Sequence, residues 1–379
     1  MRRAAAAIAF ASCLACAAKS GPPQTGSWKL MAVGPVLGPV SGPAHVWTGK
    51  EMLVWGRMPG LPCVDSPQPD PCIAALGGRY DPAPDQWQPI TSASLPSALF
   101  GGRYGFAATI WTGKEMLIWG GRCDENVICD GGAAYDPEQD KWRAMSDLNG
   151  PPRGRSDYAA AWTGTKMIIW GGTDYNFQQQ PVTLRPVGDG FAYDPDKDTW
   201  VSISSAGAPS ANNYPAFTWT GSRMVIWGIG DQLQPEGALY DPIGDTWQRM
   251  SNVGAPVRGY QLAFWTGTEV LVWNVGGGGG LYDPATDKWR PISMYNAPQS
   301  PQGLPVVWTG TELLVWSADT GGPGGRYSPK TDQWGAMTIA GQPSIRRGAQ
   351  GVWTGTEMIV WGGANSGLVS LGDGARFTP

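Results

Sequence analysis

Residues 111–119 read Trp-Thr-Gly-Lys-Glu-Met-Leu-Ile-Trp, and variants of this stretch recur seven times along the 379-residue chain. Each copy opens with Trp-Thr-Gly and carries a second Trp eight residues after the first. A third Trp follows an aromatic-x-Pro segment, as Trp87 follows Tyr80-Asp81-Pro82. The 21 tryptophans therefore form three sets of seven, which predicts seven copies of one structural unit.

Each unit is expected to hold four short strands, which in the second repeat span residues 106–111, 115–119, 132–135 and 141–145. Gly113 permits a tight hairpin between the first two strands, because Gly reaches positive φ at little cost. The second strand is apolar at nearly every position, as a strand buried on both faces should be. Units of this kind predict an all-β, seven-bladed propeller with four antiparallel strands in each blade.

The two ends of the chain are predicted to complete one blade. Trp28 is the seventh member of the third Trp set and lies near the N-terminus. The last aromatic-x-Pro segment, Phe377-Thr378-Pro379, ends the chain with no Trp after it. Residues 27–32 should therefore supply the fourth strand of the last blade, so that the ring closes without a loose terminal blade.

The repeat resembles the kelch-type β-propellers over residues 27–379. A diglycine after the second strand, a Tyr at the end of the third and a Trp in the fourth occur in the order found in that family. The complete diglycines are Gly120-Gly121, Gly171-Gly172 and Gly362-Gly363, and the other four repeats depart from this motif. The resemblance implies a kelch propeller but no particular activity, because propellers have many functions.

The N-terminus resembles a secretory signal. Met1-Arg2-Arg3 precedes an Ala-rich apolar stretch that is too short to span a bilayer. Cys16 resembles the lipidated cysteine of a bacterial lipoprotein, whereas cleavage near Ala17 would release a soluble protein. We expect a signal peptide over residues 1–16, a tether over 17–26 and a propeller over 27–379. Both routes predict an extracytoplasmic protein, either a bacterial outer-membrane or periplasmic lipoprotein or a secreted one.

Four cysteines remain after the signal, and each pair lies within one connection between a second and a third strand. The economical pairing is Cys63 with Cys72 and Cys123 with Cys129, among three possible arrangements. Disulfides of this kind imply an oxidising compartment. A zinc site is disfavoured because these loops contain no His and the cysteine spacings are long and unequal.

The composition argues against most enzyme classes. His45 is the only histidine, which excludes metal centres built from several His ligands. We interpret it as a scaffold residue, with a functional group facing the channel as the alternative. Asp194, Asp196 and Asp198 resemble a Ca²⁺ loop, but the same turn recurs in other repeats and is better explained by capping. No metal and no cofactor is therefore predicted.

Only one class of loop varies strongly in length. From the second-strand Trp to the third-strand aromatic residue the seven repeats count 25, 16, 23, 13, 9, 11 and 16 residues. Because strands alternate in direction, these loops share one face with the connections between blades. Variable loops on a rigid scaffold commonly carry recognition, so this face is the predicted binding face.

Arginines and planar polar groups gather in the connections between blades on that face. The predicted binding residues are Arg103, Tyr104, Arg155, Tyr158, Asn213, Tyr214, Arg258, Tyr260, Gln302, Arg346 and Arg347. If the arginines converge around the axis, they suit an acidic group of a partner protein or an acidic sugar. The alternative is that these arginines lie over neighbouring blades and cap turn carbonyls.

These observations favour a monomeric, non-enzymatic recognition module for an unidentified protein or glycan, whose acidic groups would suit the arginines. The alternative is a carbohydrate-active epimerase or lyase with acid–base groups among Asp174, Asp231 and Glu236. A formal charge of −4 without basic runs gives no electrostatic case for nucleic acid. Contact with a membrane is expected only through a lipid anchor at Cys16.

Overall fold

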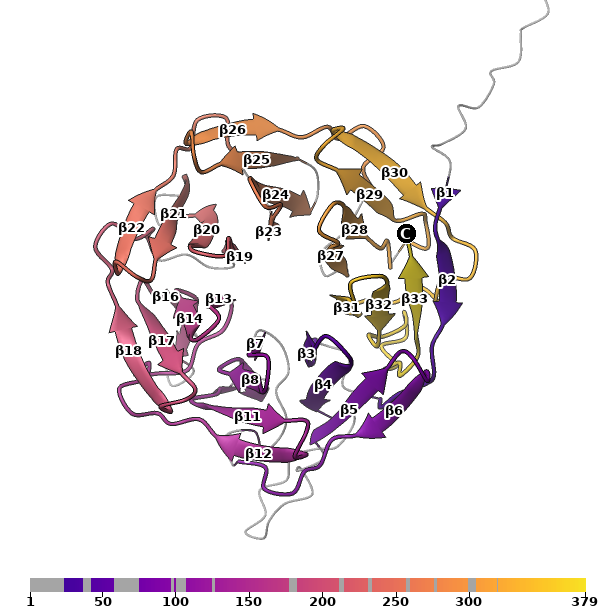
Figure 1. Cartoon of the computed structure of the whole chain (residues 1–379), viewed down its shortest axis with the longest axis horizontal. Helices are drawn as coiled ribbons and strands as arrows, with labels where there is room; N and C mark the ends of the chain where they lie inside the picture. Colours follow the sequence, from indigo (N-terminus) through magenta and orange to yellow (C-terminus); the bar gives the residue numbers. More distant parts are fainter. Residues whose placement is uncertain are drawn as a thin grey trace, which may run out of the picture.

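Seven sheets stand around a central axis in the computed structural model (Figure 1). The structure describes residues 24–36, 42–57, 75–96, 99, 107–124, 127–176, 183–210, 215–230, 234–256, 260–275, 278–298, 305–318 and 320–379. Within these residues the regular elements are all strands, and no α-helix is present. The prediction of an all-β, seven-bladed propeller is confirmed.

The first three blades run from the inner to the outer strand in chain order. Blade 1 consists of β3 (Ala44–Trp47), β4 (Met52–Arg57), β5 (Ala75–Asp81) and β6 (Gln86–Pro89). Blade 2 consists of β7 (Ala108–Trp111), β8 (Met116–Trp119), β11 (Gly132–Asp136) and β12 (Lys141–Ala144). Blade 3 consists of β13 (Ala159–Trp162), β14 (Met167–Trp170), β17 (Gly190–Asp194) and β18 (Thr199–Ile203).

The next three blades follow the same order. Blade 4 consists of β19 (Ala216–Trp219), β20 (Met224–Ile229), β21 (Pro235–Asp241) and β22 (Thr246–Arg249). Blade 5 consists of β23 (Tyr260–Trp265), β24 (Val270–Val275), β25 (Gly279–Asp283) and β26 (Lys288–Pro291). Blade 6 consists of β27 (Val306–Trp308), β28 (Leu313–Val315), β29 (Gly325–Ser328) and β30 (Gln333–Met337).

The last blade joins both ends of the chain, as predicted. It consists of β31 (Gln350–Trp353), β32 (Met358–Trp361), β33 (Gly374–Thr378) and β2 (Ser27–Leu30). The strand β2 pairs antiparallel with β33, and Trp28 lies opposite Phe377. Their rings are 5.0 Å apart, so the tryptophan that is missing after Pro379 is supplied from the start of the chain.

The apolar core is divided among the blade interfaces. In the described residues, seven clusters of buried apolar side chains each lie between two neighbouring blades. Second strands such as Met116–Trp119 are buried at every position because a blade covers each of their faces. Folding therefore depends on every blade having both neighbours.

Two of the three tryptophan sets meet at these interfaces. The second-strand Trp of one blade packs against the fourth-strand Trp of the next, with ring centroids 4.5 to 6.0 Å apart and the planes inclined. Tilted and edge-on rings are the favoured geometry for aromatic pairs. The pairs are Trp55–Trp142, Trp119–Trp200, Trp170–Trp247, Trp227–Trp289, Trp273–Trp334, Trp316–Trp28 and Trp361–Trp87.

A hydrogen-bonded clamp holds the connection between blades in six places. In blade 2, Asp140 accepts a hydrogen bond from the Tyr135 hydroxyl at 2.6 Å and another from the backbone N–H of Thr91, which follows blade 1. Trp142 Nε1 donates to the carbonyl of the same Thr91 at 2.9 Å. Burial, followed by the bond to Asp140, raises the pKa of Tyr135. The same three groups recur in blades 1 and 3 to 6.

Blade 7 keeps only the tryptophan part of this clamp, since Trp28 Nε1 donates to the carbonyl of Thr338 at 2.8 Å, and a strand outside the repeat supplies the rest. Phe377 stands where the other blades have a tyrosine, and it has no hydroxyl group. Instead β1 (Gln24–Thr25) pairs parallel with β30, and the carbonyl of Thr25 accepts the backbone N–H of Thr338 at 2.9 Å. Two residues of the stretch 17–26, predicted to be a tether, therefore belong to a strand that pairs with blade 6.

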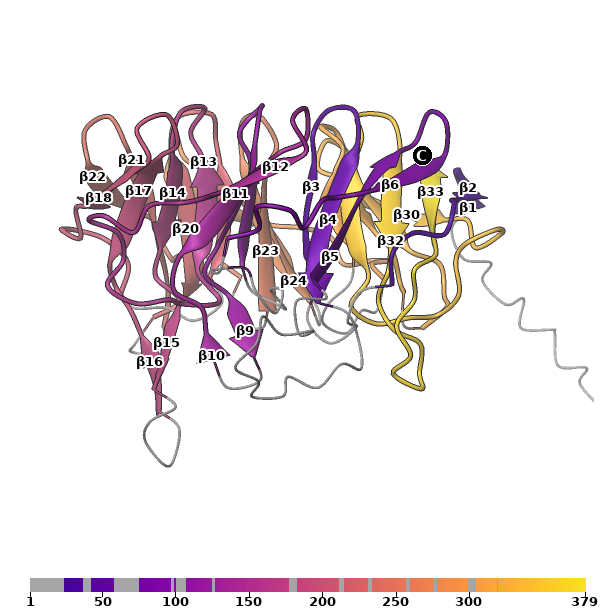
Figure 2. The same ribbon diagram turned by 90° about the horizontal axis from the view of Figure 1, so that it is seen from below.

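The two faces of the disc differ (Figure 2). We call the face with the Thr-Gly and Asp-Pro turns the tight-turn face. The opposite face, here the long-loop face, carries the connections between blades and the loops from second to third strands. Two hairpins leave it, β9–β10 (Arg122–Asp124 and Val127–Ile128) and β15–β16 (Thr173–Asn176 and Thr183–Pro186). In the described part of the chain, no helix is long and apolar enough to cross a membrane.

Candidate functional site

Arg155 does not face the mouth of the channel as a free ligand-binding group. Its side chain is only 3% exposed. One guanidinium nitrogen donates to the carbonyls of Gly171 and Asp189, both at 3.2 Å, and contacts the Asp189 carboxylate at 2.7 Å. The capping role that was considered as the alternative therefore describes Arg155, and its proposed role as a ligand-facing cation is wrong.

Arg346 occupies the equivalent place in blade 7, and all three of its guanidinium nitrogens donate hydrogen bonds. It is 1% exposed and donates to the carbonyls of Gly362 and Asp373 at 3.3 and 2.9 Å. Both oxygens of the Asp373 carboxylate accept further hydrogen bonds from it, at 2.9 and 3.0 Å. A buried guanidinium requires such partners, because an unpaired buried charge is costly. The correction made for Arg155 applies to Arg346 as well.

The sequence contains a signal for this arrangement that was missed. In both blades a complete diglycine follows the second strand, and an Asp-Gly pair opens the third: Asp189-Gly190 and Asp373-Gly374. The first glycine of each diglycine has positive φ and offers its carbonyl to the arginine. The arginine, the diglycine and the aspartate form one hydrogen-bonded unit, which fixes the start of the long loop against the preceding connection.

Tyr158 and Arg347 differ in their exposure to solvent. Tyr158 is buried, and its hydroxyl group donates to the carbonyl of Trp119 at 2.5 Å while accepting the backbone N–H of Ala108 at 2.6 Å. It therefore links blades 2 and 3 and is not a ligand platform. Arg347 is exposed on the long-loop face, where its backbone forms a bridge with Ala364. Of the predicted binding side chains that the structure describes, Arg347 is the accessible one.

The other predicted binding residues cannot be placed in the same way. Tyr260 is the first residue of β23, and only the backbone of Tyr260 is described. The predicted residues that lie outside the described part of the chain are Arg103, Tyr104, Asn213, Tyr214, Arg258, Gln302, Cys16, Cys63 and Cys72. Cys129 is 5% exposed and disulfide-bonded. It follows the hairpin that contains Cys123, and its pairing with Cys123 stays a prediction.

An apolar loop tip on the long-loop face was not foreseen. In the loop of blade 7, the side chain of Asn365 accepts the backbone N–H groups of Gly367 and Val369, both at 3.0 Å. This turn holds Leu368 at a φ of 59°, with 72% of the residue exposed, beside Val369 at 59%. A bulky residue in the left-handed region is uncommon in proteins. Ile345, 53% exposed, lies in the connection between blades 6 and 7.

The carboxylates that were considered as acid–base groups of an enzyme form hydrogen bonds or ion pairs wherever the structure describes them. Glu236 accepts hydrogen bonds from the backbone and hydroxyl of Ser210 and forms an ion pair with Arg249 at 2.7 Å. Asp174 forms an ion pair with Arg153 at 3.2 Å, and Asp231 lies outside the described residues. No cluster of three or more His, Cys, Asp or Glu suited to a metal ion occurs among the described residues.

His45 lies at the junction of blades 1 and 7. Its Nδ1 is 3.1 Å from the carbonyl of Pro43, and it also contacts the backbone of Gly351 in β31. Burial lowers the pKa of the imidazole, against the opposing effect of these two backbone hydrogen bonds. A neutral ring that bridges two blades agrees with the interpretation as a scaffold residue.

Comparison with known proteins identifies the family. A family model described as the KLHDC2/KLHL20/DRC7 Kelch-repeats domain matches residues 79–277. The chain belongs to the kelch-repeat family. Kelch domain-containing protein 3 of Homo sapiens is 29% identical over 127 residues, which are 33% of this chain and 31% of that protein. Its Bos taurus counterpart is 28% identical over the same shares of the two chains. The matched segment thus spans less than a third of the length of each relative. The kelch fold supports a protein-interaction scaffold.

The Arg346–Asp373 pair predicts a pH dependence of stability. The Arg346 guanidinium holds the pKa of Asp373 below its usual range. The pair therefore stabilises the fold fully at pH values above about 3.9, the usual pKa of an Asp side chain. This contribution is lost as the pH falls through the lower, folded pKa. D373N should reduce the free energy of unfolding at pH 7 by about 1–2 kcal/mol, after allowance for the half-exposed carboxylate.

Urea unfolding of wild type and D373N at pH 7 and at pH 3 measures this contribution. The difference between the two proteins should shrink on acidification, because the wild-type carboxylate is then increasingly protonated. A difference of the same size at both pH values would show that the lost charge is not its cause.

Proposed function

We propose that this protein is an extracytoplasmic, non-enzymatic recognition module that binds a protein partner through its long-loop face. The observation that carries the proposal is the apolar tip of Leu368 and Val369, which a hydrogen-bonded turn presents to solvent on the face that also carries the exposed Arg347. Apolar side chains and arginines are both characteristic of protein interfaces. Family membership supports interaction with proteins in general.

The architecture of the face supports the same function. The hairpins β9–β10 and β15–β16 extend from blades 2 and 3 on the side where the loop of blade 7 also lies (Figure 2). They stand on blades that are fixed by the aromatic pairs and clamps described above. Recognition elements of this kind bind with little loss of conformational entropy. Glycan binding has less support, because Tyr158 is used inside the fold.

The location outside the cytoplasm rests on two observations. The first is the N-terminal signal pattern of residues 1–16, followed by Cys16 as a lipidation site or by cleavage. The second is the disulfide-bonded state of Cys129, because disulfides persist in oxidising compartments. With lipidation, only seven residues separate Cys16 from β1, and the propeller would be held close to the membrane surface.

Replacement of the loop tip tests the proposal. L368G together with V369S should weaken capture of a partner from cell-envelope extract by about tenfold or more, because the apolar contact area is removed. Glycine at position 368 suits the left-handed backbone, so folding should be preserved. Quantitative pull-down with purified protein, followed by measured affinity for the captured partner, gives the effect.

A matched control lies on the opposite face. Ile243 is 95% exposed in the Asp-Pro turn of blade 4, so I243S removes a comparable apolar group from the tight-turn face. It should leave the affinity unchanged. Equal losses in I243S and in the loop-tip variant, or none in either, would place the binding surface elsewhere.

A further inference from the structure

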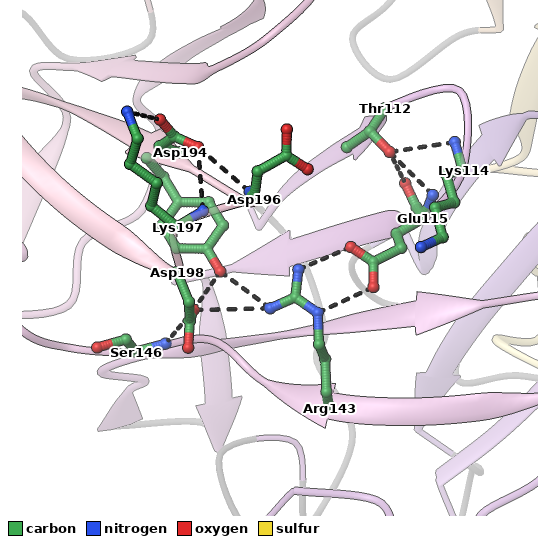
Figure 3. A network of polar contacts seen from close by, with 10 residues as sticks. Thr112, Lys114, Glu115, Arg143, Ser146, Asp194, Asp196, Lys197 and Asp198 are labelled. Atoms are coloured by element: carbon green, nitrogen blue, oxygen red, sulfur yellow. Dashed lines mark hydrogen bonds and ion pairs between the residues drawn. The ribbon is translucent and has the colours of Figure 1, made fainter.

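Arg143 pairs polar groups across a blade interface near the tight-turn face. It donates two hydrogen bonds to the carboxylate of Glu115 in blade 2, at 2.9 and 2.7 Å, and one to the hydroxyl group of Tyr193 in blade 3, at 3.1 Å (Figure 3). The bonds with Glu115 are the main cause of the raised pKa of Arg143. The opposite ends of the interfaces, beside the long-loop face, hold polar groups that are not paired in this way.

Four of the second-strand tryptophans have a buried indole N–H without an acceptor. In the described part of the chain no atom accepts a hydrogen bond from their Nε1, although these side chains are at most 1% exposed. Two other members of the set are satisfied, since Trp316 Nε1 donates to the side-chain oxygen of Gln342 at 3.1 Å and Trp361 Nε1 donates to the carbonyl of Gly372 at 2.9 Å. A donor that is buried without an acceptor is costly, so each remaining site calls for one. The four residues are Trp55, Trp170, Trp227 and Trp273.

Gln342 owes its role to its position in the connection between blades. It is the fifth residue of that connection, counted from the residue whose carbonyl accepts the clamp tryptophan, as Thr91 does. In six connections the backbone N–H of the fifth residue donates to the carbonyl three residues earlier, so the turn has the same form. Of these six residues, Gln342 alone has a polar side chain. The six are Leu95, Gly150, Ala208, Ala255, Ala297 and Gln342.

An alanine takes this position beside three of the unpartnered tryptophans. Besides accepting the N–H of Trp316, the amide of Gln342 donates to the carbonyl of Gly321 in the long loop of blade 6 at 3.1 Å. An alanine cannot reach the place of this amide. A water molecule can perform both functions, because it accepts hydrogen bonds and also donates them. The pairs that share an apolar cluster are Trp170–Ala208, Trp227–Ala255 and Trp273–Ala297.

We propose that the interfaces of blades 3 with 4, 4 with 5 and 5 with 6 each bind a buried water molecule, which accepts the indole N–H of the second-strand tryptophan. The water takes the place that the amide of Gln342 has between blades 6 and 7, and it donates to backbone carbonyls nearby. Buried waters in proteins typically form about three such hydrogen bonds. We confine the proposal to the alanine interfaces, because Leu95 brings a larger apolar side chain to this position beside Trp55.

Nuclear Overhauser cross-peaks between water and the indole protons test the proposal in perdeuterated protein with ¹⁵N-labelled tryptophan. Replacement of single tryptophans by Phe assigns the signals. Cross-peaks with water should be present for Trp170, Trp227 and Trp273, and absent for Trp316 and Trp361, whose N–H groups bond to the protein. Rotating-frame spectra separate a bound water from proton exchange, because only the dipolar cross-peaks change sign. Absence of the cross-peaks at the three alanine interfaces would overturn the proposal.

Substitutions at the fifth position move the water in a predictable way. A255Q copies Gln342 and should remove the cross-peak of Trp227 alone, whereas Q342A should create one at Trp316. The matched control A255L displaces the water without offering an acceptor, so A255Q should melt about 1–2 °C above A255L in calorimetry. A Trp227 cross-peak that survives in folded A255Q, no new cross-peak in Q342A, or equal melting of A255Q and A255L would each contradict the proposal.

Discussion

Removal of residues 1–32 should abolish cooperative folding of the propeller, and not merely fray one edge. The deletion removes β2 and with it Trp28, which packs against Trp316 at 5.7 Å and Phe377 at 5.0 Å. Loss of a packed Trp alone costs about 3–5 kcal/mol, against a typical domain stability of about 5–15 kcal/mol. Because each blade depends on both neighbours, the opened ring also exposes the edge of β33.

Calorimetry of a deletion series measures this effect. Removal of residues 1–23 should leave one sharp transition, and removal of residues 365–379 should be as damaging as removal of 1–32. Removal of residues 1–25 should have an intermediate effect, because it deletes β1 but keeps Trp28. A protein without residues 1–32 that melts like the intact chain would contradict closure by the two ends.

Closure was predictable from sequence because the tryptophans mark fixed places in the unit. The distance of eight residues between the first two Trp sets follows from a hairpin of constant length. The third set pairs with the second across every interface, so a missing member must come from elsewhere in the chain. Trp28 was the available residue, and the structure places it there.

The strand β1 was not predictable from its own residues. Gln24 and Thr25 have no apolar pattern, and they provide backbone groups, the Thr25 hydroxyl group and the Gln24 side-chain oxygen to blade 6 and the residues that follow it. The need for them follows from Phe377, which lacks the tyrosine hydroxyl group of the other blades. A comparison of the seventh repeat with the others for missing polar groups, not only missing tryptophans, would have indicated it.

The arginines of the candidate site show a different limit of sequence reasoning. Their equivalent positions were recognised, but the direction of the side chains depends on acceptors from other parts of the chain. Arg155 and Arg346 are turned inward by diglycine carbonyls and by Asp189 and Asp373.

The diglycine that binds the buried arginine should be among the positions of the chain that tolerate substitution least. Gly363 has a φ of 85°, and a Cβ there would lie 2.5 Å from the carbonyl oxygen of Arg347 and 2.8 Å from the nitrogen of Ala349. Both contacts are with backbone, which cannot rotate away. G363A should therefore reduce the free energy of unfolding by about 3 kcal/mol or more, from backbone strain together with overpacking. Equilibrium urea unfolding measures this loss.

A matched glycine separates the two causes. Gly355 in the Thr-Gly turn of the same blade has a φ of 101°, and a Cβ there would meet nothing within 4 Å. G355A should cost only the strain of a positive φ, about 1 kcal/mol. The pair G172A and G164A repeats the comparison in blade 3, where a Cβ at Gly172 would lie 2.6 Å from the carbonyl oxygen of Ser156. If G363A and G355A lose equal stability, close packing against the preceding connection is not what requires glycine at position 363.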